Sequence, residues 1–224
     1  MTESMSASEF VASHGRRSGA TKRVLAGGSA ARIGSRFEKD LEATHTVYDI
    51  RGNAKIWRVP VNTAPLPPKA LADKSYMGRA RVLSEPAPFD YVGVLANGVA
   101  CGIEAKANQE EKTSLPISGA LTKTGKKQQS RGGVRLHQLE ACVEIAWQGG
   151  IGIIVWRHGN RRGVLMPDRV REAMELYRLG NRKSIPWSAF TEYRWRRDLE
   201  GRVLEDWLTP VLEWHGKQPA GGAS

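Results

Sequence analysis

Hydrophobic and polar positions alternate along the first part of the chain with two different periods. Apolar residues recur close to the 3.6-residue period of an α-helix at Phe37, Leu41, Val47 and Tyr48. We therefore expect a first helix of about three turns that begins near Gly34. Residues 55–59, Lys-Ile-Trp-Arg-Val, instead alternate polar and apolar side chains before Pro60. That alternation is typical of a half-buried strand.

The centre of the chain has the pattern of a β-hairpin. Residues 89–95 and 99–105 are two apolar runs, and Ala96-Asn97-Gly98 joins them. Glycine and asparagine are typical of tight turns between strands.

The second half of the chain alternates helical and strand patterns. Helices are expected over 136–147 and from Pro167 to about Arg178, and strands over 151–156 and 164–166. A last amphipathic helix is expected to contain Leu199, Val203 and Trp207. The whole order predicts an α/β protein with a four- or five-stranded mixed sheet flanked by helices.

Four segments lack a regular pattern. Residues 1–31 are rich in small and basic residues, which indicates either a mobile basic arm or a disordered terminus without a role. Residues 60–88 contain many prolines and are too long for a simple connection, so an insertion between the first two strands is expected that is either functional or disordered. A basic loop without acidic residues falls within 117–136, and 216–224 are expected to form a disordered tail. The folded domain is then 32–215.

Composition narrows the choice of partners. The 224 residues include 40 % hydrophobic residues and have a net charge of +11, which favours a globular protein that binds a polyanion such as nucleic acid. No apolar run approaches the roughly 20 residues of a spanning helix, and the first ten residues do not resemble a signal peptide. Cys101 and Cys142 are too few for a disulfide framework or a zinc site, so a reducing cytoplasm without membrane contact is expected.

The hairpin contains three charged residues whose arrangement depends on its register. Glu104 and Lys106 are two positions apart on one strand and share a face. With a two-residue turn, Asp90 would pair with Ala105 and point away from Glu104. With a three-residue turn that ends in left-handed Gly98, Asp90 would lie opposite Glu104 on the same face. We predict the second register.

Such a cluster has the composition of a metal-dependent phosphodiesterase site. Two facing carboxylates repel unless a cation lies between them, and their oxygens suit Mg²⁺, for which Mn²⁺ can substitute. Lys106 would then orient a water molecule or stabilise charge in the transition state. The alternative interpretation is a surface salt bridge between Glu104 and Lys106 without catalytic meaning.

These residues resemble the core of PD-(D/E)XK nucleases, and their surroundings resemble RecU-type Holliday junction resolvases. The similar segments are, in chain order, 34–41 (Gly-Ser-Arg-Phe-Glu-Lys-Asp-Leu), 90–93 (Asp-Tyr-Val-Gly), 104–106 (Glu-Ala-Lys), 112–116 (Lys-Thr-Ser-Leu-Pro), 137–138 (His-Gln) and 181–185 (Asn-Arg-Lys-Ser-Ile). The resemblance implies a restriction-endonuclease-like fold in which 60–88 form a stalk that enters a four-way DNA junction. It also implies a homodimer that cuts the junction by paired symmetric nicks in a bacterial or phage-infected cell. The chain departs from the family in a longer 117–136 connection and in Arg81-Val82, where the stalk usually ends in adjacent aromatics.

The predicted site combines both arguments. Asp90 and Glu104 would hold the metal, and Lys106 would position the water. The resemblance implies that Glu38 assists at the metal. Without the resemblance, Glu38 is interpreted as an acid near a helix N-terminus that complements the helix dipole. DNA contacts are predicted from Lys69, Lys74, Arg79, Arg81, Thr113, Ser114, Lys123, Lys126, Lys127, Arg131, Arg135 and Gln138. Each of these could instead be an ordinary solvated or loop residue.

Two rival functions remain open from the sequence. One is a PD-(D/E)XK nuclease that acts on duplexes or ends in repair or restriction. The other is a basic protein that binds and anneals DNA on a degenerate nuclease fold, although the intact acid–acid–lysine set argues against it. Most of the seven tryptophans, including Trp57, Trp147 and Trp156, are expected in the core.

Overall fold

A computed structural model describes residues 18–60, 63–64, 81–82, 87–118, 133–198 and 203–218. Side chains are described from residue 32 onward, except in 63–64, in 81–82 and at residue 203. Within these ranges, none of the helices combines the length and apolar character needed to cross a membrane.

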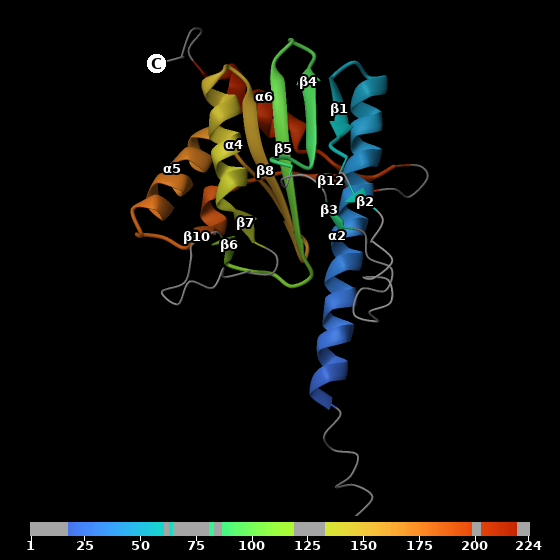
Figure 1. Ribbon diagram of the computed structural model, residues 1–224. Helices are drawn as coiled ribbons and strands as arrows, with labels where there is room; N and C mark the ends of the chain where they lie inside the picture. Colours follow the sequence, from blue (N-terminus) through green and yellow to red (C-terminus); the bar gives the residue numbers. More distant parts are fainter. Residues whose placement is uncertain are drawn as a thin grey trace, which may run out of the picture.

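The centre of the molecule is a six-stranded mixed sheet. Its strands, in spatial order, are β1 (Ala54–Arg58), β4 (Tyr91–Leu95), β5 (Ala100–Asn108), β8 (Ile151–His158), β9 (Arg161–Leu165) and β11 (Thr191–Glu192). Strands β5 and β8 pair in parallel, and all other neighbours pair antiparallel (Figure 1). The predicted α/β class with a mixed sheet is confirmed. The expected number of strands is wrong, because β11 is too short to leave a pattern in the sequence.

Helices cover both faces of this sheet. Helices α2 (Ser18–Ile50) and α6 (Leu208–Gly216) pack on one face, where Phe37, Leu41, Ile103 and Val211 belong to a single buried cluster. Helices α4 (Leu136–Trp147) and α5 (Pro167–Arg178) pack on the other face, in a cluster with Leu139, Ile154 and Val170. Helix α4 contacts β5 and β8. Both α4 and α5 have the bounds that the sequence predicts.

Helix α2 is much longer than expected. It begins at Ser18 rather than near Gly34, so 18–31 of the predicted mobile arm are helical, and 1–17 lie outside the described residues. Its N-terminal part extends beyond the sheet (Figure 1), and the first buried side chain described in it is Phe37. Alanine, leucine, lysine and arginine favour a helix without any apolar stripe, so hydrophobic periodicity could not reveal this part.

Smaller sheets surround the main one. Strand β6 (Ser114–Ser118) lies between β10 (Ser184–Pro186) and β7 (Val134–Arg135), and a short 3₁₀-helix η3 (Trp187–Ala189) follows β10. Strands β2 (Thr63–Ala64) and β3 (Arg81–Val82) pair with each other. The 60–88 insertion therefore interrupts the chain between the neighbouring strands β1 and β4. Most of this insertion and 119–132 of the basic loop lie outside the described residues.

The expected helix over 199–207 is wrong. Strands β12 (Trp195–Arg197) and β13 (Val203–Glu205) form an antiparallel pair, and α6 begins only at Leu208. Pro210 lies in the first turn of α6, where a missing backbone N–H is tolerated. Trp207 is buried in the α2 cluster but precedes the helix. The last residues of the predicted tail, 219–224, are outside the described part.

Two of the three tryptophans expected in the core are exposed. Trp156 is fully buried, but Trp57 is 50 % exposed and Trp147 is 73 % exposed. Trp57 is on β1, which is the edge strand of the main sheet within the described residues, and Trp147 is the last residue of α4. Among the described residues, no further element packs over either position.

Candidate active site on the β4–β5 hairpin

The β4–β5 hairpin has the register that brings the two acids together. Tyr91 pairs with Ile103 and Val94 with Ala100, and the Leu95 N–H donates to the Val99 carbonyl at 2.9 Å. Gly98 closes the turn at φ 85°, a left-handed conformation that glycine adopts without strain. The same register places Asp90 opposite Glu104, with the Asp90 N–H donating to the Ile103 carbonyl at 3.0 Å. The predicted three-residue turn is confirmed.

The acids lie on the α4 side of the sheet. Tyr91 and Ile103 face α2, so their neighbours Asp90 and Glu104 face the opposite side. Glu104 is 1 % exposed, whereas Asp90 is only partly buried. The Ala105 N–H donates to Asp90 Oδ2 at 2.9 Å and holds that carboxylate over β5. The pair is thus one buried acid beside one accessible acid.

Lys106 completes the cluster from the same strand. Its ammonium forms an ion pair with Glu104 Oε1, and its side chain is 18 % exposed. Glu104 Oε2 is buried without a hydrogen-bond partner among the described residues. The contact is therefore a largely buried one, unlike the surface salt bridge of the alternative interpretation. It leaves one buried carboxylate oxygen unsatisfied, which is costly unless a proton or a cation occupies it.

Burial dominates the protonation of Glu104. It raises the pKa of Glu104 to about 8; Lys106 opposes the shift, and the charge of Asp90 adds to it. A carboxyl group in this position keeps its proton at neutral pH because its charged form is desolvated and faces a second carboxylate. A divalent cation between the two acids would reverse this preference.

The residues fit a metal site of low protein coordination. No group of three or more His, Cys, Asp or Glu side chains that could hold a metal occurs among the described residues. Two carboxylates suffice for Mg²⁺ when water and substrate phosphate oxygens supply the other ligands. The unsatisfied Glu104 oxygen and the facing Asp90 carboxylate are consistent with that arrangement.

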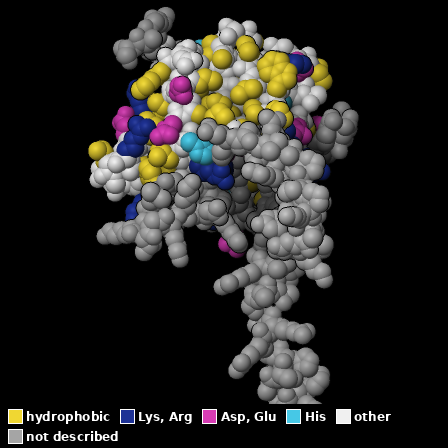
Figure 2. Space-filling model, viewed as in Figure 1, with side chains coloured by type: hydrophobic (Ala, Val, Ile, Leu, Met, Phe, Trp, Pro, Cys, Tyr) yellow, Lys and Arg dark blue, Asp and Glu magenta, His cyan; other side chains and the backbone are white. Residues whose placement is uncertain are grey.

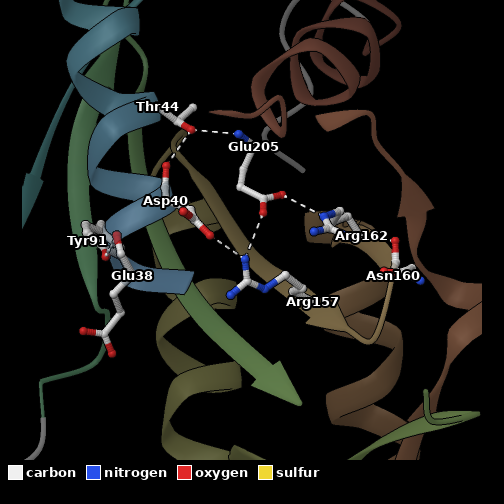
Figure 3. Close-up of polar contacts among 8 residues, drawn as sticks. All are labelled: Glu38, Asp40, Thr44, Tyr91, Arg157, Asn160, Arg162 and Glu205. Atoms are coloured by element: carbon white, nitrogen blue, oxygen red, sulfur yellow. Dashed lines mark hydrogen bonds and ion pairs between the residues drawn. The ribbon is translucent and has the colours of Figure 1, made fainter. Parts of the chain in front are cut away.

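Glu38 lies apart from the acid pair. Its carboxylate pairs with Arg58 on β1 at 2.5 Å, and its backbone carbonyl accepts from the Tyr91 hydroxyl at 3.3 Å. Both partners are on the α2 side of the sheet. In Figure 3 the Glu38 side chain points away from Arg157. The structure does not bring Glu38 to Glu104, so its role depends on the resemblance alone.

The structure describes the side chains of only some of the other predicted site residues. Arg135 is exposed immediately before α4, while Gln138 is buried and its Oε1 accepts the Arg135 N–H at 2.8 Å. This bond caps the helix, so the Gln138 carbonyl oxygen is engaged in local structure. Thr113 precedes β6, and Ser114 begins it. The remaining basic candidates lie outside the described side chains: Lys69, Lys74, Arg79, Arg81, Lys123, Lys126, Lys127 and Arg131.

Sequence reasoning missed the residues that anchor the end of β5. The Trp156 indole N–H donates to Asn108 Oδ1 at 2.9 Å, and the Lys112 N–H donates to His158 Nδ1 at 2.9 Å. His158 is fully buried against Trp156, and burial lowers its pKa, so the ring is neutral and can accept that bond. These contacts fix the chain as it leaves the site strand.

A buried ion network on the opposite face was also missed. Arg157 Nη1 lies 2.6 Å from Asp40 and 3.4 Å from Glu205, and Arg162 Nε lies 3.4 Å from the other Glu205 oxygen (Figure 3). Thr44 adds a hydrogen bond from the Glu205 N–H at 2.8 Å. Burial raises the pKa of Glu205, and the two arginines oppose the shift. The network joins α2 and β13 to the sheet, and no local sequence pattern indicates it.

A cavity of about 230 Å³ lies between α2 and β1. The residues that line it are Glu42, His45, Thr46, Asp49, Ile56, Arg58 and Tyr91. Burial lowers the pKa of His45 to about 3, so this histidine is neutral. The cavity is on the α2 side of the sheet and therefore does not belong to the acid pair.

Comparison with known proteins adds no family. The sequence matches no model of a protein family and no curated protein.

Proposed function

We propose that the protein is a metal-dependent DNA endonuclease with a restriction-endonuclease-like arrangement of its core. The observation that supports this most directly is the hairpin register, which gathers Asp90, Glu104 and Lys106 on one face of the sheet. Helix α2, the β4–β5 hairpin, helix α4 and the parallel strand β8 form the mixed α/β core that this proposal requires.

Asp90 and Glu104 are the residues that would hold the ion, proposed to be Mg²⁺ with Mn²⁺ as a substitute. A bound divalent ion supplies charge neutralisation at a phosphodiester and a more acidic water. The partly exposed Asp90 is reachable from solvent, while the buried Glu104 is held by β5 between β4 and β8.

Lys106 has two tasks in this proposal. Before substrate binds, its ammonium lies against Glu104 and opposes the rise of the Glu104 pKa that burial causes. With a phosphodiester present, the same ammonium is available to a phosphate oxygen or to the attacking water, because part of its side chain remains exposed. The proton held by Glu104 at neutral pH must leave when the ion is bound.

The proposed substrate is branched DNA, cut by paired symmetric nicks. Net charge of +11 favours a polyanion, and the choice of a four-way junction comes from the resemblance. Two equal cuts require two related sites, so a two-fold homodimer is proposed. Free, buried Cys101 and Cys142 are compatible with a reducing compartment such as the cytoplasm.

Cleavage of synthetic DNA tests the proposal. A labelled four-way junction and a linear duplex of the same sequence are incubated with the protein in Mg²⁺ or in EDTA, and the cut positions are mapped. We expect symmetric nicks in the junction, only with the ion, and their loss in Asp90→Asn. Asp168→Asn, which changes an exposed acid at the start of α5, is the matched control and keeps full activity.

Each outcome discriminates between functions. Equal cutting of duplex and junction would favour a nuclease without branch selectivity. DNA binding without any cleavage would favour the annealing protein. Full activity of Asp90→Asn would refute the site.

A further inference from the structure

The sheet face beside the acid pair carries exposed apolar side chains. Trp57 on β1 is 50 % exposed, and Val92 and Val94 on β4 are 38 % and 39 % exposed. All three are on the α4 side of the sheet, but α4 contacts β5 and β8, and no other helix of the described residues packs on β1 and β4 from that side. In the view of Figure 2, hydrophobic side chains gather over the region where Figure 1 places β4 and β5.

The strand registers place this surface next to the proposed catalytic residues. Trp57 pairs with Val92, and Val92 with Gly102, so these residues form one row across three strands. The next row on the same face contains Asp90 and Glu104. Trp57 is a diagonal neighbour of Asp90, a relation that corresponds to roughly 7–8 Å and lies within reach of an aromatic side chain.

The surface is preformed rather than adaptable. A Cβ at Gly102 would lie 2.6 Å from the Phe89 ring, so that ring fills the row next to Val92. The row beyond consists of Lys55, Val94 and Ala100, and the Lys55 ammonium pairs with Asp49. No acidic side chain belongs to either row.

We propose that Trp57 stacks on a base at the branch of the junction, in the DNA strand that is cut, where the base has lost a stacking neighbour. The inference rests on the proposed function, because it places one nucleotide of that substrate. An exposed indole offers a flat apolar face to any base without reading its sequence. Val92 and Val94 then exclude water from the sugar beside it, and the adjoining phosphate is directed toward Asp90. Base pairs at the branch of an open junction lack a stacking neighbour on one side, unlike those inside a duplex. An indole can reach an open base face only there, so the contact contributes selectivity for branched DNA.

Affinity and base stacking test the inference directly. A four-way junction with 2-aminopurine at the branch point is titrated with wild type, Trp57→Ala and Trp57→Phe in EDTA, so that no strand is cut. Stacking of a base on an aromatic ring contributes enough that Trp57→Ala should bind the junction about fivefold to about 150-fold more weakly. The quenching of 2-aminopurine fluorescence that wild type causes on binding should be lost in Trp57→Ala as well. Trp57→Phe should keep most of both signals.

The control separates this role from a general effect of removing an exposed indole. Trp147→Ala changes a tryptophan that is 73 % exposed at the far end of α4 and should bind the junction like wild type. Thermal unfolding of all variants establishes that they fold. The affinity for linear duplex should be unchanged in Trp57→Ala.

The outcomes also separate this inference from the proposed function. If wild type cuts junctions but Trp57→Ala binds and quenches as wild type does, the stacking role is wrong and the nuclease stands. If sedimentation shows that Trp57→Ala converts a dimer into a monomer, a second copy of the chain covers this face and the inference is overturned. If wild type neither binds nor cuts DNA, the proposed function is wrong, and the inference that rests on it is wrong as well.

Discussion

Replacement of the buried carboxylate of Glu104 should change how stability depends on pH. In the folded protein, burial raises the pKa of Glu104 from 4.5 to about 8. Between these two values the folded state holds a proton that the unfolded state has released. This group therefore contributes full stability below pH 4.5, and the contribution falls as pH rises toward 8.

The size of the effect follows from the same pKa. Each pH unit inside this window costs about 1.4 kcal/mol, so the free energy of unfolding should fall by about 3 kcal/mol between pH 4.5 and pH 7 on account of Glu104. Glu104→Gln has no titrating group at this position and should lose that slope. The difference in free energy of unfolding between the variant and wild type should therefore shift in favour of the variant by about 3 kcal/mol between pH 4.5 and pH 7.

Urea unfolding in EDTA, measured at several pH values between 4.5 and 8, checks this expectation. Glu175→Gln removes an exposed carboxylate on α5 and should keep the wild-type slope. Added Mg²⁺ at pH 7 should stabilise wild type, by about 1.4 kcal/mol at a tenfold excess over its dissociation constant, and leave Glu104→Gln unchanged. Parallel slopes in wild type and Glu104→Gln would refute the argument that burial controls this acid.

Three further substitutions probe how the site is supported, each followed by urea unfolding at pH 7. Arg157→Met leaves Glu205 with one arginine and should cost about 3–5 kcal/mol, partly recovered when Glu205→Gln is added; no loss would mean that the ion network is not structural. Gly152→Ala puts a Cβ 2.3 Å from the Cys142 carbonyl, so α4 must move from β8 at a cost of roughly 1–3 kcal/mol; a neutral result would contradict the close approach. Gly98→Ala should cost about 1–2 kcal/mol because its φ is 85°, and an unaffected protein would argue against the left-handed turn.

The parts of the fold that follow local chemistry were predictable. A glycine at the third position of the 96–98 turn decides the hairpin register, and all of that information lies within a few residues. Helices α4 and α5 were predicted with their bounds because apolar stripes and Gly149 or Pro167 delimit them. The acid pair was predictable for the same reason, since two short strands position it.

The parts that depend on distant contacts were not predictable. Arg157 meets Glu205 48 residues and Asp40 117 residues away along the chain, and no spacing rule links them. The spacing of Leu199, Val203 and Trp207 fits a helix, but 203–205 pair with β12 instead. Tertiary pairing decides between strand and helix for such short apolar runs.

The exposure of Trp57 shows a third kind of limit. Its alternating surroundings predict a strand correctly, and its size suggests burial. Whether its face is covered depends on where α4 packs, across β5 and β8 rather than β1 and β4. Periodicity identifies which residues share a face, but not which face another layer will cover.

The two strands that pair with β5 are connected to it by chain segments of very different length. Strand β4 reaches it through a tight turn, whereas β8 joins in parallel only after a crossover that includes α4. During refolding, Glu104 can thus meet Asp90 while the Glu104 carboxylate is still hydrated. The desolvation of Glu104 follows with the slower closure by β8 and α4, and at neutral pH this late step takes up a proton because burial raises the pKa of Glu104. Alkaline conditions would therefore slow the completion of the sheet while leaving the formation of the hairpin untouched.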